Sequence, residues 1–100
     1  MVAIATLRER VIGVLVSLGE GEVVSYGDVA SDAGFPRQSR AVGAILAAGS
    51  DDVPWWRVVR ADGRLATEPA AGQAQLLRSE GVTVRDGRVV AAPAGRFRRP

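Results

Sequence analysis

The sequence predicts a single, mainly α-helical domain that carries short β-hairpins and a helix-turn-helix. Apolar residues recur at helical spacing in several segments, two of these segments meet at a glycine corner, and two Asp-Gly pairs stand beside β-type apolar runs. The chain has 100 residues, of which 47% are hydrophobic and 24% charged. That length and composition indicate one modest core rather than a disordered chain.

The first predicted helix runs from about Ile4 to Leu18, and its inward face carries Leu7, Val11, Val14, Leu15 and Leu18. Gly19 and Gly21 are expected to end it. Val23 and Val24 then predict a short extended segment.

A helix pair is predicted next. Ser25 is suited to cap a short helix that closes before Gly34, and Pro36 suits the first position of a second helix. The inward side of this second helix carries Val42, Ile45 and Leu46. Two helices around a glycine turn are typical of a helix-turn-helix that enters a DNA groove, although all-α cores use the same corner.

The second half predicts two hairpins around a helix. The apolar run from Val53 leads as a strand to a tight turn at Asp62-Gly63, and Thr67 caps a helix that ends near Ser79 before Gly81. Its expected inward residues are Ala71, Ala74 and Leu77, joined by Ala70 and Leu76. The stretch VTVRDGRVV predicts a hairpin with Asp86-Gly87 at its tip. Residues 1–92 are expected to form the domain, and residues 93–100 a flexible basic tail with frayed structure.

Composition excludes several kinds of chemistry. The chain has no Cys and no His, and its 13 basic residues are all Arg, set against 11 acidic residues for a net charge of +2. Thiol nucleophiles, imidazole bases, Lys Schiff bases and ordinary zinc sites are therefore excluded, and no cofactor or metal is expected. The exclusive use of Arg favours phosphate binding, or it reflects codon usage in a GC-rich genome. No apolar stretch predicts a membrane span or secretory signal, so we expect a cytoplasmic, nucleoid-associated protein.

Four motifs occur in a recognisable order: VSY, then RAVG, then PWWRVV, then LLRSEGV. With these motifs the chain, over about residues 7–90, resembles the DNA-binding domain of the O6-alkylguanine-DNA alkyltransferase family. The resemblance implies a winged helix-turn-helix-like fold. It also implies a monomer that binds double-stranded DNA carrying O6-alkylguanine.

The box PWWRV departs from the reactive members, which carry P-C-H-R-V there. Trp55 stands at the position of the alkyl-accepting Cys, and Trp56 at that of the activating His. The chain therefore resembles the alkyltransferase-like branch, which does not repair DNA. Glu80 matches the Glu of the family's Cys-His-Glu relay, and without a His we expect it to anchor Arg57 or a backbone amide.

The resemblance also implies DNA-binding roles. Tyr26 matches the Tyr that presses on a phosphate and helps to rotate the nucleotide, and Arg40 the arginine finger that fills the vacated stack. Small residues beside Arg40, Ala41 and Gly43, permit close approach to the minor groove or simply close helix packing. The DNA backbone is the expected partner of Arg37, Gln38 and Ser39.

For the lesion pocket, the resemblance implies that Trp55 faces the damaged base, with Val53 and Pro54 as the adjoining wall. On an extended chain Trp56 points to the opposite side and supports the pocket from behind. Arg57 is expected to hold the pocket loop by bonding carbonyls. The family's hinge Asn is absent, with Gly49 and Ser50 in its place, and the loop from Ala66 to Gly72 is expected to cover a roomy pocket.

These features predict a non-enzymatic DNA damage sensor that flips O6-alkylguanine and flags it for nucleotide excision repair proteins. A winged-helix regulatory or architectural protein without lesion specificity is the alternative. A hydrolytic enzyme or glycosylase that uses Glu80 on the flipped base is a third hypothesis.

Overall fold

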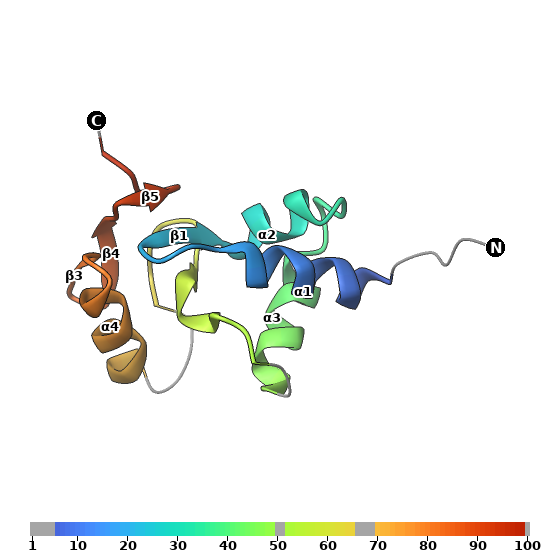
Figure 1. The fold of residues 1–100 in the computed structure, drawn as a ribbon, viewed down its shortest axis with the longest axis horizontal. Helices are drawn as coiled ribbons and strands as arrows, with labels where there is room; N and C mark the ends of the chain where they lie inside the picture. Colours follow the sequence, from blue (N-terminus) through green and yellow to red (C-terminus); the bar gives the residue numbers. More distant parts are fainter. Residues whose placement is uncertain (1–5, 50–51, 66–69, 100) are drawn as a thin grey trace.

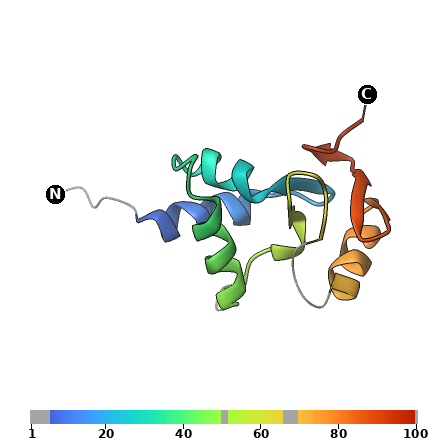
Figure 2. The same ribbon diagram turned by 180° about the vertical axis from the view of Figure 1, so that it is seen from behind.

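The computed structural model describes residues 6–49, 52–65 and 70–99. The three helices of the N-terminal half lie on one side of a short central strand, and the helix of residues 70–79 lies with a β-hairpin on the other side (Figures 1 and 2). The elements in chain order are α1 (Leu7–Ser17), β1 (Glu22–Ser25), α2 (Tyr26–Asp32), α3 (Ser39–Ala48), the 3-10 turn η1 (Trp55–Arg57), β2 (Val58–Val59), α4 (Ala70–Ser79), β3 (Thr83–Arg85), β4 (Arg88–Ala91) and β5 (Ala94–Gly95). Among the described residues, no helix combines the length and apolarity needed to cross a bilayer.

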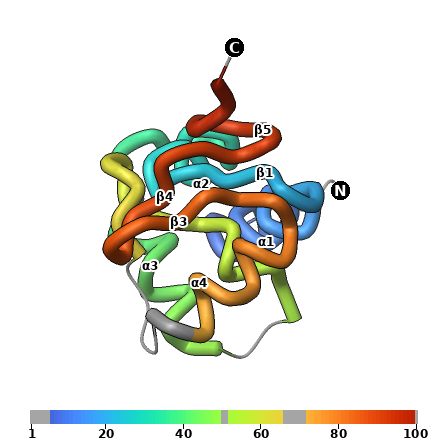
Figure 3. The backbone as a smooth tube through the Cα atoms, turned by 90° about the vertical axis from the view of Figure 1, so that its left-hand side faces the viewer, coloured from blue at the N-terminus to red at the C-terminus, as the bar shows by residue number. Residues whose placement is uncertain are grey.

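Strand β1 divides the hydrophobic core into two clusters. It pairs in parallel with β2, so that Val24 lies opposite Val58 and Ser25 opposite Val59. Because successive side chains of a strand point to opposite faces, Val24 and Val58 pack among helices α1, α2 and α3. Val23 and Val59 pack on the other face, against α4 and the β3–β4 hairpin. Figure 3 shows this hairpin in front of β1 and beside α4.

Helix α1 follows its prediction on the inward side and differs at its start. Val11, Leu15 and Leu18 are buried, and Leu7 and Val14 are partly buried against them. The helix begins at Leu7 rather than near Ile4, which itself lies outside the described residues. The cause is Thr6, whose backbone is extended and whose hydroxyl accepts the Glu9 N–H at 3.1 Å as an N-cap.

The predicted helix pair is confirmed as α2 and α3. Ser25 and Asp28 form a capping box at the start of α2, with reciprocal bonds of 3.0 and 2.9 Å. The second helix begins at Ser39, so the placement of Pro36 at its first position is wrong. Pro36 instead occupies a tight turn that the Gln38 N–H closes onto the Phe35 carbonyl at 3.0 Å.

The second half differs most from its prediction. The run from Val53 forms the 3-10 turn η1 and only two strand residues, because β2 pairs in parallel with the distant β1. The chain does turn at Asp62-Gly63, but Arg64 then bridges to Arg88 of β4 rather than returning along β2. The Asp86-Gly87 hairpin is confirmed, with both residues at positive φ as its tight turn requires.

Helix α4 buries Ala74 and Leu77 as predicted, whereas Leu76 is 38% exposed, against expectation. Its predicted cap, Thr67, lies outside the described residues, and so do the side chains of Ala70 and Ala71. The loop predicted to cover the pocket is also undescribed from Ala66 to Pro69.

The expectation of a frayed tail is wrong for residues 94–99. Ala94 and Gly95 form β5, which pairs in parallel with the edge of β1 that β2 leaves open. Arg96 makes a two-pronged ion pair with Asp28, at 2.8 and 2.9 Å. This bond is the largest cause of the lowered pKa of Asp28. The ion pair with Asp28 and the backbone pairing with β1 thus hold this segment on the domain.

Candidate nucleic-acid interface and lesion pocket

Tyr26 and helix α3 meet at one surface. Tyr26 is the first residue of α2, and its half-buried ring packs on the helical core cluster. A Cβ placed on Gly43 would lie 3.9 Å from Cε1 of this ring, an ordinary contact distance. An alanine would therefore also fit here, so the contact with Tyr26 does not decide between close helix packing and close approach to the minor groove as the role of Gly43. Burial raises the pKa of the Tyr26 phenol, and the charge of nearby Arg60 partly offsets the rise.

The start of α3 is exposed and chemically open. Arg37, Gln38, Ser39 and Arg40 all lie at the surface, and Ala41 is partly buried. Gln38 precedes the helix but makes no side-chain capping bond, so the first-turn N–H groups are open to solvent or a ligand. The structure thus gathers four predicted DNA-binding side chains and free helix N–H groups in one place.

The tryptophan box is a tight turn rather than an extended strand. The Arg57 N–H bonds the Pro54 carbonyl at 3.1 Å, and the two indole rings stand edge to face with centroids 6.0 Å apart. Trp55 packs on the helical cluster together with Val53, and Trp56 packs on the cluster of α4 and the hairpin. The two rings therefore point to opposite sides, as predicted, but the extended backbone assumed for them is wrong, and each ring packs partly on a core cluster.

Glu80 anchors the box from beyond the end of α4. Its Oε1 accepts the Gly21 N–H and Arg57 Nε, both at 2.9 Å. Its Oε2 accepts Trp56 Nε1 at 2.8 Å and an Arg57 terminal nitrogen at 2.7 Å. Both partners predicted for Glu80, Arg57 and a backbone amide, are thus observed, and Trp56 is a third.

The indole of Trp56 makes the hydrogen bond that the family relay assigns to an imidazole. Its N–H donates to Glu80, and the guanidinium of Arg57 lies over its ring, 5.2 Å from the centroid, in a cation–π contact. Arg57 also donates to the Leu18 carbonyl at 2.8 Å, which agrees with its expected role in bonding carbonyls. The box is therefore tied both to α4 and to the end of α1.

The electrostatics of this cluster favour its charged form. The Arg57 guanidinium lowers the pKa of Glu80 from 4.5 to about 2, and the Gly21 and Trp56 donors act in the same direction. Glu80 in turn raises the pKa of Arg57. A carboxylate with four donors and so low a pKa is unsuited to proton transfer near neutral pH.

Gln73 is a site residue that sequence reasoning missed. It is fully buried on the inward face of α4, and its amide donates to the Trp56 and Val58 carbonyls at 3.2 and 3.0 Å. The signal was its position four residues before Leu77, on the face predicted to be inward. A polar side chain on such a face needs a buried partner, and the box carbonyls supply two.

Gly49 and Ser50 are the residues at the place of the family's hinge Asn. Gly49 ends α3 in the left-handed conformation at φ 63°, and Ser50 lies outside the described residues. The described part of the chain contains no group of three or more His, Cys, Asp or Glu residues placed to hold a metal ion.

This chain is similar to a known protein family and to several characterised proteins. Residues 6–82 match the model of the "6-O-methylguanine DNA methyltransferase, DNA binding domain". A DNA base-flipping protein of Escherichia coli K12 is 41% identical over 80 residues, which are 76% of this chain and 62% of that protein. A DNA base-flipping protein of Vibrio parahaemolyticus is 30% identical over 79 residues, 75% of this chain and 79% of the relative.

Solved structures show the same fold. S. pombe Atl1 in complex with damaged DNA containing O6-carboxymethylguanine matches with a TM-score of 0.72 and 26% identity over 79% of each chain. Mycobacterium tuberculosis OGT in complex with DNA matches with a TM-score of 0.65 and 33% identity, over 78% of this chain and 51% of that one. The chain thus spans about half of the OGT and 62% of the E. coli relative.

Proposed function

Because the chain belongs to the family of the 6-O-methylguanine DNA methyltransferase DNA-binding domain, we propose that it binds O6-alkylguanine in duplex DNA and flips the damaged base without repairing it. The supporting observation concerns the tryptophan box, residues 54–58: the bonds that hold it in place are present, but it contains neither a Cys nor a His. Glu80 and Arg57 hold the box by charge-assisted bonds, while Trp55 and Trp56 occupy the two reactive positions.

Alkyl transfer needs a nucleophile that the sequence lacks. A thiolate accepts an alkyl group from guanine O6 by forming a C–S bond as the C–O bond breaks, and this chain contains no Cys. An indole carbon or N–H does not replace a thiolate. The site therefore binds the lesion and leaves the alkyl group on the DNA.

On the DNA side, the start of α3 enters the minor groove. Arg40 is exposed and makes no side-chain bond to another described residue, which leaves its planar cation available to fill the space of a flipped base. Ala41 keeps the flank of the helix narrow, and Arg37, Gln38 and Ser39 are placed to bond backbone phosphates. Tyr26, held against Gly43, presses on the phosphate of the target nucleotide.

In the pocket, Trp55 offers its indole to the alkylated purine, with Val53 and Pro54 as the adjoining wall. Trp56 keeps the ring of Trp55 upright through their edge-to-face contact, and Glu80 fixes Trp56. The recognition surface is thus an aromatic face backed by an ion pair, which suits binding rather than proton transfer.

A protein that leaves the lesion in place needs another activity to remove it. Nucleotide excision repair removes a stretch of the damaged strand and requires no chemistry from the protein that marks the site. We therefore include presentation of the flipped lesion to nucleotide excision repair proteins in the proposal. The similarity to DNA base-flipping proteins and to Atl1 in complex with damaged DNA supports its first part only.

The test is a binding titration by fluorescence anisotropy with two duplexes that differ only in O6-methylguanine against guanine, followed by mass spectrometry of the DNA. Tighter binding to the modified duplex, with its methyl group retained, is the expected result. Equal binding to both would favour the regulatory or architectural alternative. Loss of the methyl group or release of a free base would mean that the protein is a catalyst.

A further inference from the structure

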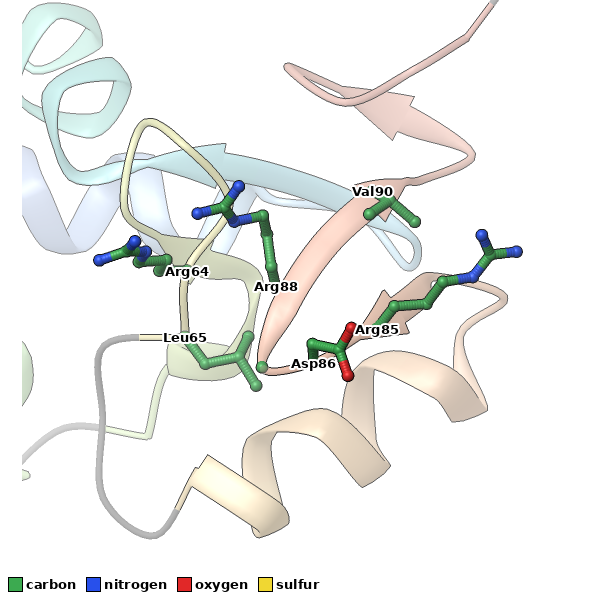
Figure 4. Close-up of a pocket in the computed structure, with 7 residues that line it drawn as sticks. Arg64, Leu65, Arg85, Asp86, Arg88 and Val90 are labelled. Atoms are coloured by element: carbon green, nitrogen blue, oxygen red, sulfur yellow. The ribbon is translucent and has the colours of Figure 1, made fainter.

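A groove lies between the 60–65 turn and the β3–β4 hairpin, away from the tryptophan box. Its volume is about 610 Å³, and its lining includes Arg64, Arg85 and Arg88. In Figure 4, Arg64 and Arg88 extend toward one side of the groove and Arg85 toward the other, with Asp86 between them. Guanidinium groups that diverge in this way do not converge on one small anion, but they suit an extended polyanion.

The turn that carries Arg64 is held rigidly on the hairpin. The Arg60 N–H bonds the Arg64 carbonyl at 3.0 Å, and the Val89 N–H bonds the Gly63 carbonyl at 2.8 Å. A Cβ on Gly63, at φ +91°, would overlap the Val89 carbonyl oxygen, so glycine permits this close approach. The arginines of the turn and of β4 are therefore held in a defined register.

Arg64 and Arg88 form a like-charge pair across this register. They face each other in an antiparallel bridge, an arrangement that costs stability unless the charges are matched. Asp62 is the shared counter-ion, with its Oδ2 at 3.4 Å from Arg64 Nε and 3.9 Å from an Arg88 terminal nitrogen. All three side chains are 44–60% exposed. One loosely placed carboxylate thus serves two guanidiniums, which leaves net positive charge facing solvent.

This charged pair lies on a path that starts at Tyr26. Strands β1 and β2 are parallel, with Ser25 opposite Val59, so the residues that follow them, Tyr26 and Arg60, leave the sheet at the same end, the carboxyl end of both strands. The effect of Arg60 on the pKa of the Tyr26 phenol agrees with this proximity. From Arg60 the chain proceeds within the same turn to Arg64.

We propose that the Arg64–Arg88 pair and its groove bind backbone phosphates of the same duplex, beyond the nucleotide that Tyr26 contacts. The inference rests on the proposed function, because it assumes that Tyr26 faces DNA. Asp62 limits this contact, and its charge makes the groove a weaker phosphate site than two unpaired arginines would be.

The test measures anisotropy titrations of the wild type and of Arg64→Gln, Arg88→Gln and Asp62→Asn from 50 to 200 mM salt, on modified and unmodified duplexes. Each arginine variant should lower the slope of log affinity against log salt by about 1. From 50 to 200 mM salt, the factor by which its affinity falls should then be about four times smaller than that of the wild type. The preference for the modified duplex should stay unchanged, because phosphates carry no lesion signal.

Asp62→Asn should change the affinity for DNA in the opposite direction to the arginine variants. The Asn oxygen still accepts the Arg64 N–H that Asp62 bonds at 3.0 Å, so the turn is kept while the charge is removed. This variant should bind both duplexes more tightly than the wild type. A merely structural role for the ion pair predicts no gain.

Charge-matched controls separate the groove from net charge. Glu9→Gln makes the same charge change on α1, at the other end of the molecule from the hairpin (Figure 1). Arg10→Gln removes an exposed arginine from the same helix. Wild-type salt slopes for Arg64→Gln and Arg88→Gln, or an Asp62→Asn affinity no higher than that of Glu9→Gln, would overturn the groove assignment alone. A wild type that binds neither duplex would overturn the proposed function as well.

Discussion

Replacement of Glu80 by Gln tests the cluster that holds the tryptophan box. Each carboxylate oxygen of Glu80 accepts two donors, one of them from Arg57 in both cases. A Gln side chain keeps one acceptor oxygen and presents an NH2 group to the other two donors. The variant therefore loses two bonds and leaves the guanidinium, 14% exposed, without its counter-ion.

Two routes give a similar size for this loss. Two charge-assisted bonds at about 1.5 kcal/mol each amount to about 3 kcal/mol. The depression of the Glu80 pKa from 4.5 to about 2 corresponds to about 3 kcal/mol when each pKa unit is worth about 1.4 kcal/mol. We expect Glu80→Gln to lower the free energy of unfolding at pH 7 by about 3 kcal/mol, measured by urea denaturation.

The pH dependence gives the prediction a sign. In the unfolded chain Glu80 binds a proton near pH 4.5, whereas in the folded protein it stays ionised until about pH 2. The stabilisation is therefore complete above about pH 5 and is lost as the pH falls toward 2. The difference in stability between wild type and Glu80→Gln should shrink over that range.

Glu9→Gln is the control, because Glu9 is exposed at the start of α1 and the substitution removes the same charge. Its effect should stay below about 1 kcal/mol, the range for a charge at a helix N-terminus. A free energy of unfolding for Glu80→Gln within about 0.5 kcal/mol of the wild-type value, or a difference that does not change with pH, would refute the reasoning.

Three further outcomes are expected. Arg40→Ala should weaken binding to the modified duplex by about 1–3 kcal/mol in an anisotropy titration, and unchanged affinity would remove the finger assignment. Trp55→Cys should not restore repair, since the neighbouring position also holds Trp in place of the activating His; a mass increase of the variant after incubation with methylated DNA would contradict this. Gly63→Ala should lower the free energy of unfolding by about 2 kcal/mol more than Gly87→Ala. Both glycines have positive φ, but only a Cβ at Gly63 meets the Val89 carbonyl, so equal losses in urea denaturation would argue against that clash.

Local signals predicted the N-terminal half of the fold well. The inward face of α1, the Ser25 cap and the helix pair all depend on residues within a few positions of one another. Pro36 shows the limit of such signals, because a proline suits both a first helical turn and a tight turn. The hydrogen bond from the Gln38 N–H to the Phe35 carbonyl settles the choice, and sequence spacing does not reveal it.

Long-range pairing determined the parts that sequence reasoning missed. The apolar run at Val58 was predicted as part of a hairpin, but its strand partner is β1, more than thirty residues earlier. Arg96 was assigned to a flexible tail because nothing near it indicates that Asp28 is its partner. The Glu80–Arg57 bond was predicted through the family resemblance rather than from periodicity, and Trp56 joined it because its N–H occupies the donor position of an imidazole.

The parallel pairing of β5 with β1 has a consequence for the order of assembly during translation. Residues from α1 to β2 contain the whole helical cluster, so this half has its own apolar contacts once residue 58 has left the ribosome. The far face of β1 and its open edge stay uncovered until the hairpin and β5 are synthesised. Of the surfaces of β1, the edge that β5 will pair with therefore stays exposed longest in the nascent chain. We expect chaperones to bind the nascent chain mainly at this unpaired edge.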